Sequence, residues 1–370
     1  MADIGALIDQ FIAKDASDLY LTVGATPLVR AASSIVSIDN EVLTEERVQS
    51  FIRTILSDAV YDEFSSTLEY NTAINWKDTA RLRINLFKQR QNSGMVLRRI
   101  YTQIPSFAEL GLPPLYGNLV MEKRGLILIV GQTGAGKSSS LASMLEYRNQ
   151  HGGGHILTIE DPIEFLLSHK KCIITQRDIG IDTYSFGIGL KNALRQAPDV
   201  IVIGEIRDRE AMEHAISFSE TGHLCLATLH ANNANQAIER ILNFFPEEKH
   251  QQILLNLSMN LKAILSQRLL PNLAGSRSLA VEIMLNQGLI KQLIQSGKVK
   301  ELKQCIENGS SEGMQTFDQH LVRLYEAGII TQETAFAESV SPAEVRLALK
   351  QKELANRPDL ARTVDRNKDF

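Results

Sequence analysis

The chain has 370 residues, of which 44% are hydrophobic and 22% charged, as is typical of a soluble globular protein of about two domains. Its formal net charge of −4 argues against general nucleic-acid affinity, and its odd number of cysteines without C-x-x-C spacing argues against a disulfide framework or a zinc ribbon. It has no basic signal region and no apolar run near the roughly 20 residues that span a bilayer, so we expect a cytosolic protein.

Residues 1–104 are predicted to form a mixed α/β domain with its own small core. Apolar residues recur at helical spacing in one segment and alternate in three others: 4–12, 19–23, 68–76 and 82–86. The last of these segments places Arg81 and Arg83 together on the face opposite its apolar residues. Periodicity alone favours a solvated face for this basic pair.

A linker is predicted at 105–114, because proline and glycine interrupt helix and strand there. The domain after it, 115–349, contains short apolar runs separated by helical stretches: 126–130, 156–159, 200–203 and 224–229. This pattern predicts an α/β nucleotide-binding core whose mainly parallel sheet is covered on both faces. A helix is expected from about Glu247 to Leu269, and a flexible polar tail at 350–370.

The segment Gly131–Ser138 follows the first of these runs and fits the phosphate-binding pattern G-x-x-x-x-G-K-S/T. In such a loop backbone N–H groups point at phosphate oxygens, Lys137 reaches the outer phosphates and the Ser138 hydroxyl contacts Mg2+. The helix predicted after the loop adds a dipole that favours anions. We therefore expect a nucleoside triphosphate and Mg2+ to be bound here, by Gly131, Gln132, Thr133, Gly134, Ala135, Gly136, Lys137, Ser138 and Ser139.

Acidic residues follow two of the predicted strands. Glu160, Asp161 and Glu164 come after the second apolar run, at the sheet edge where such folds bind ligands, and a solvated turn is the alternative. Glu205 follows the third run, as a Walker B acid does. Its length suits contact with Mg2+ through a bound water, and a plain strand-end acid is the alternative.

Two histidines, His223 and His230, bracket the fourth apolar run. A regular strand would place them on opposite faces, which disfavours a zinc site that they share with Cys225. We expect one or both to act as hydrogen-bonding sensors of the phosphate or of a neighbouring subunit. A core histidine with satisfied hydrogen bonds remains an equal alternative.

Four motifs of this chain, in this order, resemble those of type II secretion and type IV pilus ATPases: G-Q-T-G-A-G-K-S, I-E-D-P-I-E, D-V-I-V-I-G-E-I-R-D and T-G-H-L-C-L-A-T-L-H. They match the Walker A motif, the Asp box, the atypical Walker B motif and the His box. Ser17–Leu21 and Ala80–Asn85 also resemble the PAS-like N-terminal domain of the retraction branch. The resemblance implies a PAS-like domain, a RecA-like ATPase domain, ATP bound between them and a homo-hexameric ring.

The same resemblance implies roles for individual residues. Glu164 matches the water-activating acid, Glu205 the Walker B acid, and Glu160 is a supporting candidate. Basic groups around the phosphates are implied at Arg83, Arg98, Arg195 and Arg207. An arginine there stabilises charge on the γ-phosphoryl group, in cis or across a subunit boundary, which gives the basic strand face of the first domain a function.

Assembly-type ATPases of this family carry an extra N-terminal domain and a paired C-x-x-C insert, and this sequence shows neither. It therefore resembles a retraction ATPase of the PilT/PilU type. Three segments and the charged tail resemble PilU more than PilT: Arg195–Asp199, Leu229–Asn235 and Phe244–Lys249. The stretch Leu289–Gln295 lacks both arginines of the PilT element A-I-R-x-L-I-R, and Tyr20 stands where a histidine is frequent.

The resemblance implies a hexameric ATPase, peripheral at the cytoplasmic face of the inner membrane, that drives or assists pilus retraction and twitching motility. The expected partners are a PilT-type retraction ATPase and the inner-membrane platform protein of the pilus, with no nucleic acid and no transmembrane segment. An accessory nucleotide-bound ring with little catalysis is the alternative. A nucleic-acid translocase is a third possibility, which the acidic net charge and the lack of a basic, aromatic single-strand track disfavour.

Overall fold

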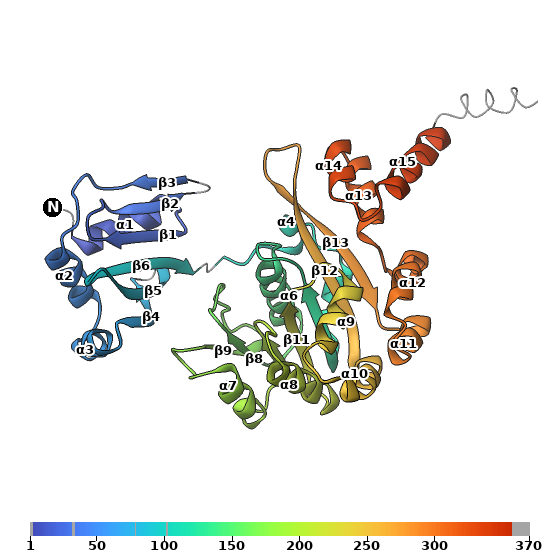
Figure 1. Ribbon diagram of the computed structural model, residues 1–370, viewed down its shortest axis with the longest axis horizontal. Coiled ribbons are helices and arrows are strands. Elements are labelled where there is room, and N and C mark those ends of the chain that lie inside the picture. The colour runs from blue at the N-terminus through green and yellow to red at the C-terminus, as the bar shows by residue number, and fades with distance from the viewer. Residues whose placement is uncertain (1–2, 32–33, 78, 101–102, 357–370) are drawn as a thin grey trace, which may run out of the picture. The chain divides into compact units, whose positions relative to one another are not determined.

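The computed structural model describes residues 3–31, 34–77, 79–100 and 103–356, which divide into two units (Figure 1). The first unit comprises the chain up to Ile104 together with Pro162–Leu167 and Arg177–Ser185, and the second comprises the remainder. Among the residues that the structure describes, no helix has both the length and the apolar character needed to cross a membrane.

The first unit contains a six-stranded sheet in the order β3-β2-β1-β6-β5-β4, and its paired strands are antiparallel. The strands are β1 (Asp18–Thr22), β2 (Leu28–Ala31), β3 (Ser34–Ser37), β4 (Glu69–Trp76), β5 (Ala80–Gln89) and β6 (Asn92–Ile100). The helices are α1 (Ile4–Ala13), α2 (Glu45–Ile55) and α3 (Asp58–Thr67). Burial alternates along β5, so Leu82 is buried while Arg81 and Arg83 lie on the other face, as predicted.

The second unit contains a seven-stranded sheet in the order β13-β12-β7-β11-β10-β8-β9. Its strands are β7 (Gly125–Val130), β8 (Gly154–Glu160), β9 (Cys172–Asp178), β10 (Val200–Ile203), β11 (Leu224–Leu229), β12 (Leu261–Pro271) and β13 (Arg277–Leu285). The pairs that link β12, β7, β11, β10 and β8 are parallel. Every residue of β7, β10 and β11 is buried, which confirms the predicted α/β core with a mainly parallel sheet covered on both faces.

The helices that connect these strands match most of the predicted pattern. They are α4 (Phe107–Leu110), α5 (Leu115–Val120), α6 (Lys137–His151), α7 (Phe186–Ala193), the 3-10 helix η1 (Leu194–Gln196), α8 (Arg209–Glu220), α9 (Ala234–Leu242) and α10 (Glu247–Asn260). The predicted linker is not wholly irregular, because α4 lies within it. A capping box between Ser106 and Glu109 begins this helix.

The helix predicted from Glu247 to Leu269 is wrong after Asn260, where α10 ends and β12 begins. β12 pairs with β7 on one side and with β13 on the other, so it is an interior strand of the sheet. Most residues on both faces of β12 are buried. The strand therefore lacks the alternation of apolar and polar residues that would distinguish it from a helix in the sequence.

The chain continues beyond the sheet with helices that pack on one another (Figure 1). The main ones are α11 (Gly288–Gln295), α12 (Leu302–Asn308), α13 (Phe317–Glu326), α14 (Gln332–Ala337) and α15 (Pro342–Asn356). The prediction of a flexible tail from residue 350 is wrong up to Asn356, because α15 extends to that residue. The rest of the predicted tail lies outside the described residues.

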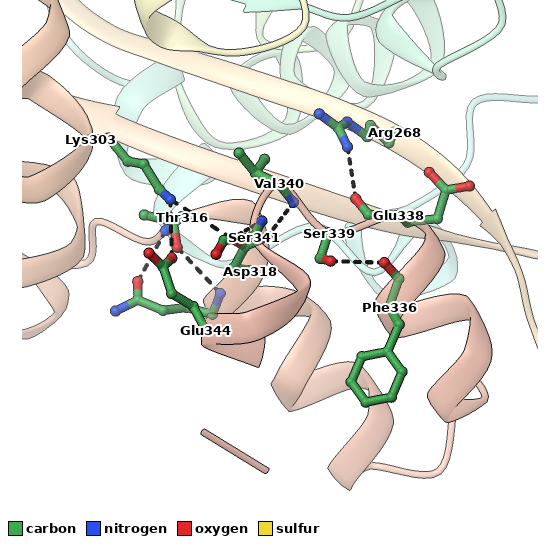
Figure 2. A network of polar contacts seen from close by, with 11 residues as sticks. Arg268, Lys303, Thr316, Asp318, Phe336, Glu338, Ser339, Val340, Ser341 and Glu344 are labelled. Carbon is green, nitrogen blue, oxygen red and sulfur yellow. Dashed lines mark hydrogen bonds and ion pairs between the residues drawn. The ribbon is translucent and has the colours of Figure 1, made fainter. Parts of the chain in front are cut away.

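Figure 2 shows the polar contacts that fasten α15 to this group of helices. Asp318 on α13 is only 7% exposed, and its two carboxylate oxygens accept hydrogen bonds from the backbone N–H groups of Val340 (2.7 Å) and Ser341 (3.0 Å). Lys303 on α12 pairs with Asp318 (3.9 Å) and with Glu344 on α15 (3.1 Å). One buried carboxylate thus accepts two hydrogen bonds from the backbone directly before α15.

Candidate functional site

The predicted phosphate loop joins the end of β7 to the start of α6. Gly134 and Gly136 adopt φ angles of +78° and +82°, a left-handed conformation that glycine adopts without steric cost. Gly136 is the N-cap residue of α6, so the loop ends where the N–H groups of the helix N-terminus are available to an anion. The loop therefore has the positive-φ glycines and leads directly into a helix N-terminus, a geometry suited to an anion.

Gly131, the first residue of the loop, packs directly against β12. A Cβ atom placed on Gly131 would lie 2.7 Å from the carbonyl oxygen of Gln267 and 2.8 Å from the Cβ of Ala135. The side chain of Gln267 also donates to the Ser140 hydroxyl on α6 (2.8 Å). β12 therefore supports both the loop and the helix that follows it, and only glycine fits at position 131 without displacing backbone.

The Lys137 ammonium group is folded over the loop that precedes it. Its Nζ donates to the carbonyl oxygens of Gly131 (2.8 Å) and Gln132 (2.9 Å). The Gln132 side chain in turn donates to Asn232, which follows β11 (3.0 Å). The loop is thus held by its own lysine and by the neighbouring strand-end segment.

Acidic and basic side chains meet at the carboxyl ends of the neighbouring parallel strands. Glu205 follows β10, and its Oε1 lies 2.8 Å from Nε2 of His230, which follows β11. Its Oε2 accepts from Nε of Arg207 (2.8 Å), and this hydrogen bond raises the pKa of the guanidinium group. Arg207 also pairs with Asp161, which follows β8, at 3.1 Å. These contacts join residues from three strand ends.

A polar cavity of about 610 Å³ opens beside the loop. Gln132 and Thr133 of the loop, His230 and the polar face of α9 line it. His230 therefore contacts Glu205 and also borders the cavity beside the phosphate loop. A histidine in this position can exchange hydrogen bonds between the acid and a ligand, which fits its predicted sensor role.

Oxygen donors here suit Mg2+, which is held in proteins by one or two carboxylates, by water and by the phosphates of a nucleotide. The donors are the Ser138 hydroxyl in the first turn of α6 and the Glu205 carboxylate, which is 20% exposed. Within the described residues no group of three His, Cys, Asp or Glu side chains is arranged to hold a metal by itself.

The two other predicted acids have different surroundings. Glu160 accepts hydrogen bonds from the Thr158 hydroxyl (2.6 Å) and from the Gln176 side chain (3.2 Å) at the end of β8. Glu164 is exposed and lies in the segment Pro162–Leu167, which groups with the first unit. Neither carboxylate belongs to the described contacts around Glu205.

Two predicted site residues lie near the amino ends of the strands. His223 precedes β11, and its carbonyl accepts from Gly125 at the start of β7 (3.0 Å). Arg195 lies in η1 and donates to Asn192 (3.2 Å). The structure therefore does not bring them to the cluster around Glu205. A strand of six residues separates His223 from His230, which is about 20 Å of extended chain.

The two predicted arginines of the first unit are direct neighbours. Arg83 on β5 stands opposite Arg98 on β6 in the register of the two strands. Nε of Arg98 donates to Oδ1 of Asp18 on β1 (2.7 Å), which raises the pKa of the arginine. This unit therefore presents two guanidinium groups on one face of its sheet, one of them tied to a buried carboxylate.

Sequence reasoning assigned no individual role to several residues that these contacts reveal, although it counted Asp161 among the acids at the sheet edge. They are Asp18, Asp161, Asn232 and Gln267. The first three stand inside motif segments, so a signal was present. No such sequence signal marks Gln267, because it contacts the loop through its backbone carbonyl, a group that every residue has.

Comparisons with known proteins agree along most of the chain. A family model described as "Type II/IV secretion system protein" matches residues 6–364. The chain is similar to the type IV pilus ATPase PilU of Pseudomonas aeruginosa, with 47% identity over 93% of the chain and 90% of the relative. It is also similar to PilT of the same organism, described as a retraction ATPase, with 37% identity over 92% and 99%. Among solved structures, the pilus retraction motor PilT with bound ADP matches with a TM-score of 0.86 and 40% identity, over 93% of this chain and 99% of PilT.

Proposed function

From the premise that the chain belongs to the type II/IV secretion system protein family and is a pilus retraction ATPase of the PilT/PilU type, we propose a PilU-like hexameric motor. In this proposal the ring hydrolyses ATP to assist retraction of the type IV pilus and depends on a partner motor of the PilT type. The observation that carries the hydrolysis of ATP is the position of His230, which contacts Glu205 and borders the cavity beside the phosphate loop. The PilU-like role is proposed from the similarity to PilU.

The phosphate loop binds the triphosphate through backbone N–H groups at the start of α6. Lys137 leaves the carbonyl oxygens of Gly131 and Gln132 and turns to the outer phosphates. Since those carbonyls carry no full charge, a phosphate oxygen competes well for the ammonium group. Binding of nucleotide therefore replaces a contact within the loop by a contact with the ligand.

Glu205 and Ser138 are the residues that would hold Mg2+, which neutralises charge that develops on the phosphates. Glu205 contacts His230 and Arg207 in the structure. Both partners carry N–H groups that would also be suited to hydrogen bonds with the γ-phosphoryl group. Glu164 is the proposed water-activating acid and Glu160 a supporting acid, on the resemblance alone.

Positive charge around the phosphates is proposed to come from Arg83 and Arg98 of the first unit, in cis or from a neighbouring copy in the ring. Arg195 stays a candidate for contact with a neighbouring copy, because it is exposed and remote from Glu205. The ring is proposed to act at the cytoplasmic face of the inner membrane, against the platform protein of the pilus.

ATP turnover by the purified full chain tests the catalytic part of this proposal. We expect Lys137→Ala to abolish turnover, and Glu164→Gln to lower it by about 100-fold. The matched control is Lys123→Ala, which removes an exposed lysine at the opposite end of β7. Full activity of Glu164→Gln would exclude that residue as the water activator, and full activity of Lys137→Ala would overturn the assignment of the loop.

Partner dependence is tested by measuring turnover with and without a purified PilT-type ATPase, and by scoring twitching in cells that lack either protein. Support comes from the resemblance to PilU and from α11, where Lys291 and Gln295 stand in place of the two arginines of the PilT element. We expect turnover by the chain alone and no retraction without the partner. Turnover only with the partner would favour the accessory ring, and retraction without the partner would exclude dependence.

A further inference from the structure

Four strands of the first unit, β2, β1, β6 and β5, are adjacent in its sheet (Figure 1). A row of charged residues crosses these strands. In strand register, Arg30 stands opposite Asp18, Asp18 opposite Arg98, and Arg98 opposite Arg83. Residues directly opposite each other on paired strands project from the same face of the sheet. The row therefore holds three guanidinium groups and one carboxylate on one face, a formal excess of two positive charges.

Asp18 differs from the other members of the row because it is buried, with an exposure of 3%. Its Oδ1 accepts from Arg98 Nε at 2.7 Å, and its Oδ2 accepts from the Ser17 hydroxyl at 2.8 Å. Arg30 Nε lies 3.7 Å from the same Oδ2. A buried carboxylate is stable in the fold only when it is paired and hydrogen-bonded, and here both oxygens are engaged.

Arg98 is exposed to 63% although it makes this contact, so the pair anchors one end of a side chain that otherwise reaches solvent. A guanidinium group has five N–H donors in a rigid planar fork, and Asp18 accepts the one on Nε. The fork is therefore fixed at its base, and a fixed fork loses less conformational entropy when it binds a phosphate bidentately.

We propose that Asp18 is a positioning residue that holds the base of the Arg98 guanidinium group so that its terminal N–H groups bind a nucleotide phosphate. The inference rests on the proposed function, in which Arg98 acts on the phosphates. Arg30 lies on the other side of the same carboxylate, and its own position is held by a hydrogen bond from its Nε to the Tyr20 hydroxyl at 3.0 Å.

The adjacent residue of β6 offers a matched control. Arg99 donates to Asp15 at 2.6 Å, so it is also an arginine of this strand held by an aspartate. Asp15, however, is 84% exposed, and Arg99 projects from the opposite face of the sheet. Asp15→Asn therefore removes a comparable ion pair of the same strand without touching the charged row.

The test is a double-mutant cycle on the full chain, with kcat and KM for ATP and thermal unfolding measured for each variant. We expect Asp18→Asn to lower kcat/KM by about 10-fold to 100-fold, Arg98→Ala to lower it at least as much, and Asp15→Asn to leave it unchanged. Introduced into Arg98→Ala, the Asp18→Asn change should alter kcat/KM by less than about 2-fold.

Equal effects of Asp18→Asn in both backgrounds would show a role in folding alone and overturn the inference. Normal kinetics for Asp18→Asn beside impaired Arg98→Ala would overturn it while leaving the proposed function intact, whereas normal kinetics for Arg98→Ala would remove the phosphate role itself. If Asp18→Asn does not fold, Arg98→Lys is measured in its place, because lysine keeps the positive charge but lacks the planar fork of N–H donors. We expect it to lower kcat/KM by a similar factor, and full activity of this variant would overturn the inference.

Discussion

At the scale of single residues, Gly131 shows how tightly the phosphate loop is packed. The Gly131→Ala substitution would place a methyl group 2.7 Å from the Gln267 carbonyl oxygen, and backbone atoms cannot give way cheaply. We expect the free energy of unfolding to fall by about 1–3 kcal/mol and nucleotide binding to weaken. Denaturant unfolding and titration with a fluorescent nucleotide measure both effects. Gly153→Ala, whose added Cβ would meet only Lys171 O at 3.9 Å, is the neutral control.

Glu205 is the second residue whose role is sharply testable. Glu205→Gln keeps the size of the side chain and removes the charge that faces His230 and Arg207. We expect ATP turnover to fall by about 100-fold or more, because a carboxylate is needed at the metal. The unfolding free energy should change by less than about 1 kcal/mol, since the contacts of Glu205 with His230 and Arg207 are partly exposed. Glu213→Gln breaks the surface pair with Arg209 and should alter neither quantity, and wild-type turnover of Glu205→Gln would refute the Walker B assignment.

The sequence predicted these residues unequally, for a physical reason. The glycines and Lys137 belong to a motif whose members are adjacent in the chain, so spacing alone locates the loop. The contacts of Glu205 join strand ends that are separated by more than twenty residues, and periodicity does not state which loop side chains meet. The positions of His223 and Arg195 near the amino ends follow from strand direction, which the sequence could have supplied.

At the scale of elements, the attachment of α15 depends on Asp318. Asp318→Ala would leave the N–H groups of Val340 and Ser341 without their acceptor and Lys303 without one of its partners. We expect a loss of about 2–4 kcal/mol in local stability, read out as faster hydrogen exchange in α15. Glu344→Ala removes only the exposed partner of Lys303, for which about 0.5 kcal/mol is expected. Equal exchange in both variants would show that apolar packing alone holds α15.

His320 links α13 to β13 and makes that contact sensitive to pH. Its Nδ1 accepts from the Val281 N–H at 2.9 Å, and burial, with a smaller effect of Arg323, lowers the pKa of His320 to about 4. The unfolded chain binds this proton near pH 6.5, so the contribution to stability is complete above that pH and is lost as the pH falls toward 4. The loss amounts to about 3 kcal/mol.

Denaturant unfolding at pH 7, 5.5 and 4 measures this effect. His320→Asn keeps an acceptor and cannot be protonated, so its unfolding free energy should fall less steeply than that of the wild type between pH 6.5 and 4. His151→Asn changes an exposed histidine and should keep the wild-type slope. Parallel curves for wild type and His320→Asn would contradict the assignment.

Elements with one buried face were predicted well. Among the strands buried on both faces, the short strands β7, β10 and β11 were predicted from their apolar runs, whereas the longer β12 was not. β5 alternates between buried and partly exposed residues, and its apolar pattern identifies it at once. β12 is enclosed by two strands and by helices, so its apolar residues fit a helix as readily as a strand. Whether such a segment forms a strand depends on the neighbouring strands with which it pairs. The local sequence pattern does not reveal those neighbours.

At the scale of the whole molecule, assembly is the property that the proposed motor requires. Static light scattering with ATP and Mg2+ should give about six times the 41.2 kDa mass of the chain. Turnover measured on the same sample should rise with the hexamer fraction, and Lys137→Ala should separate assembly from catalysis. A monomer that hydrolyses ATP at full rate would contradict any contribution of arginines from a neighbouring copy.

Two consecutive residues of β12 serve opposite sides of the sheet. The Gln267 side chain donates to Ser140 on α6, whereas Arg268 donates to the Glu338 carbonyl (2.8 Å) and covers the Phe317 ring. Consecutive strand residues project to opposite faces, so a shift of one position would exchange the two sets of partners. A one-residue insertion or deletion at this point of the strand would therefore disrupt both sets of contacts at once, those with the helix behind the phosphate loop and those with the C-terminal helices.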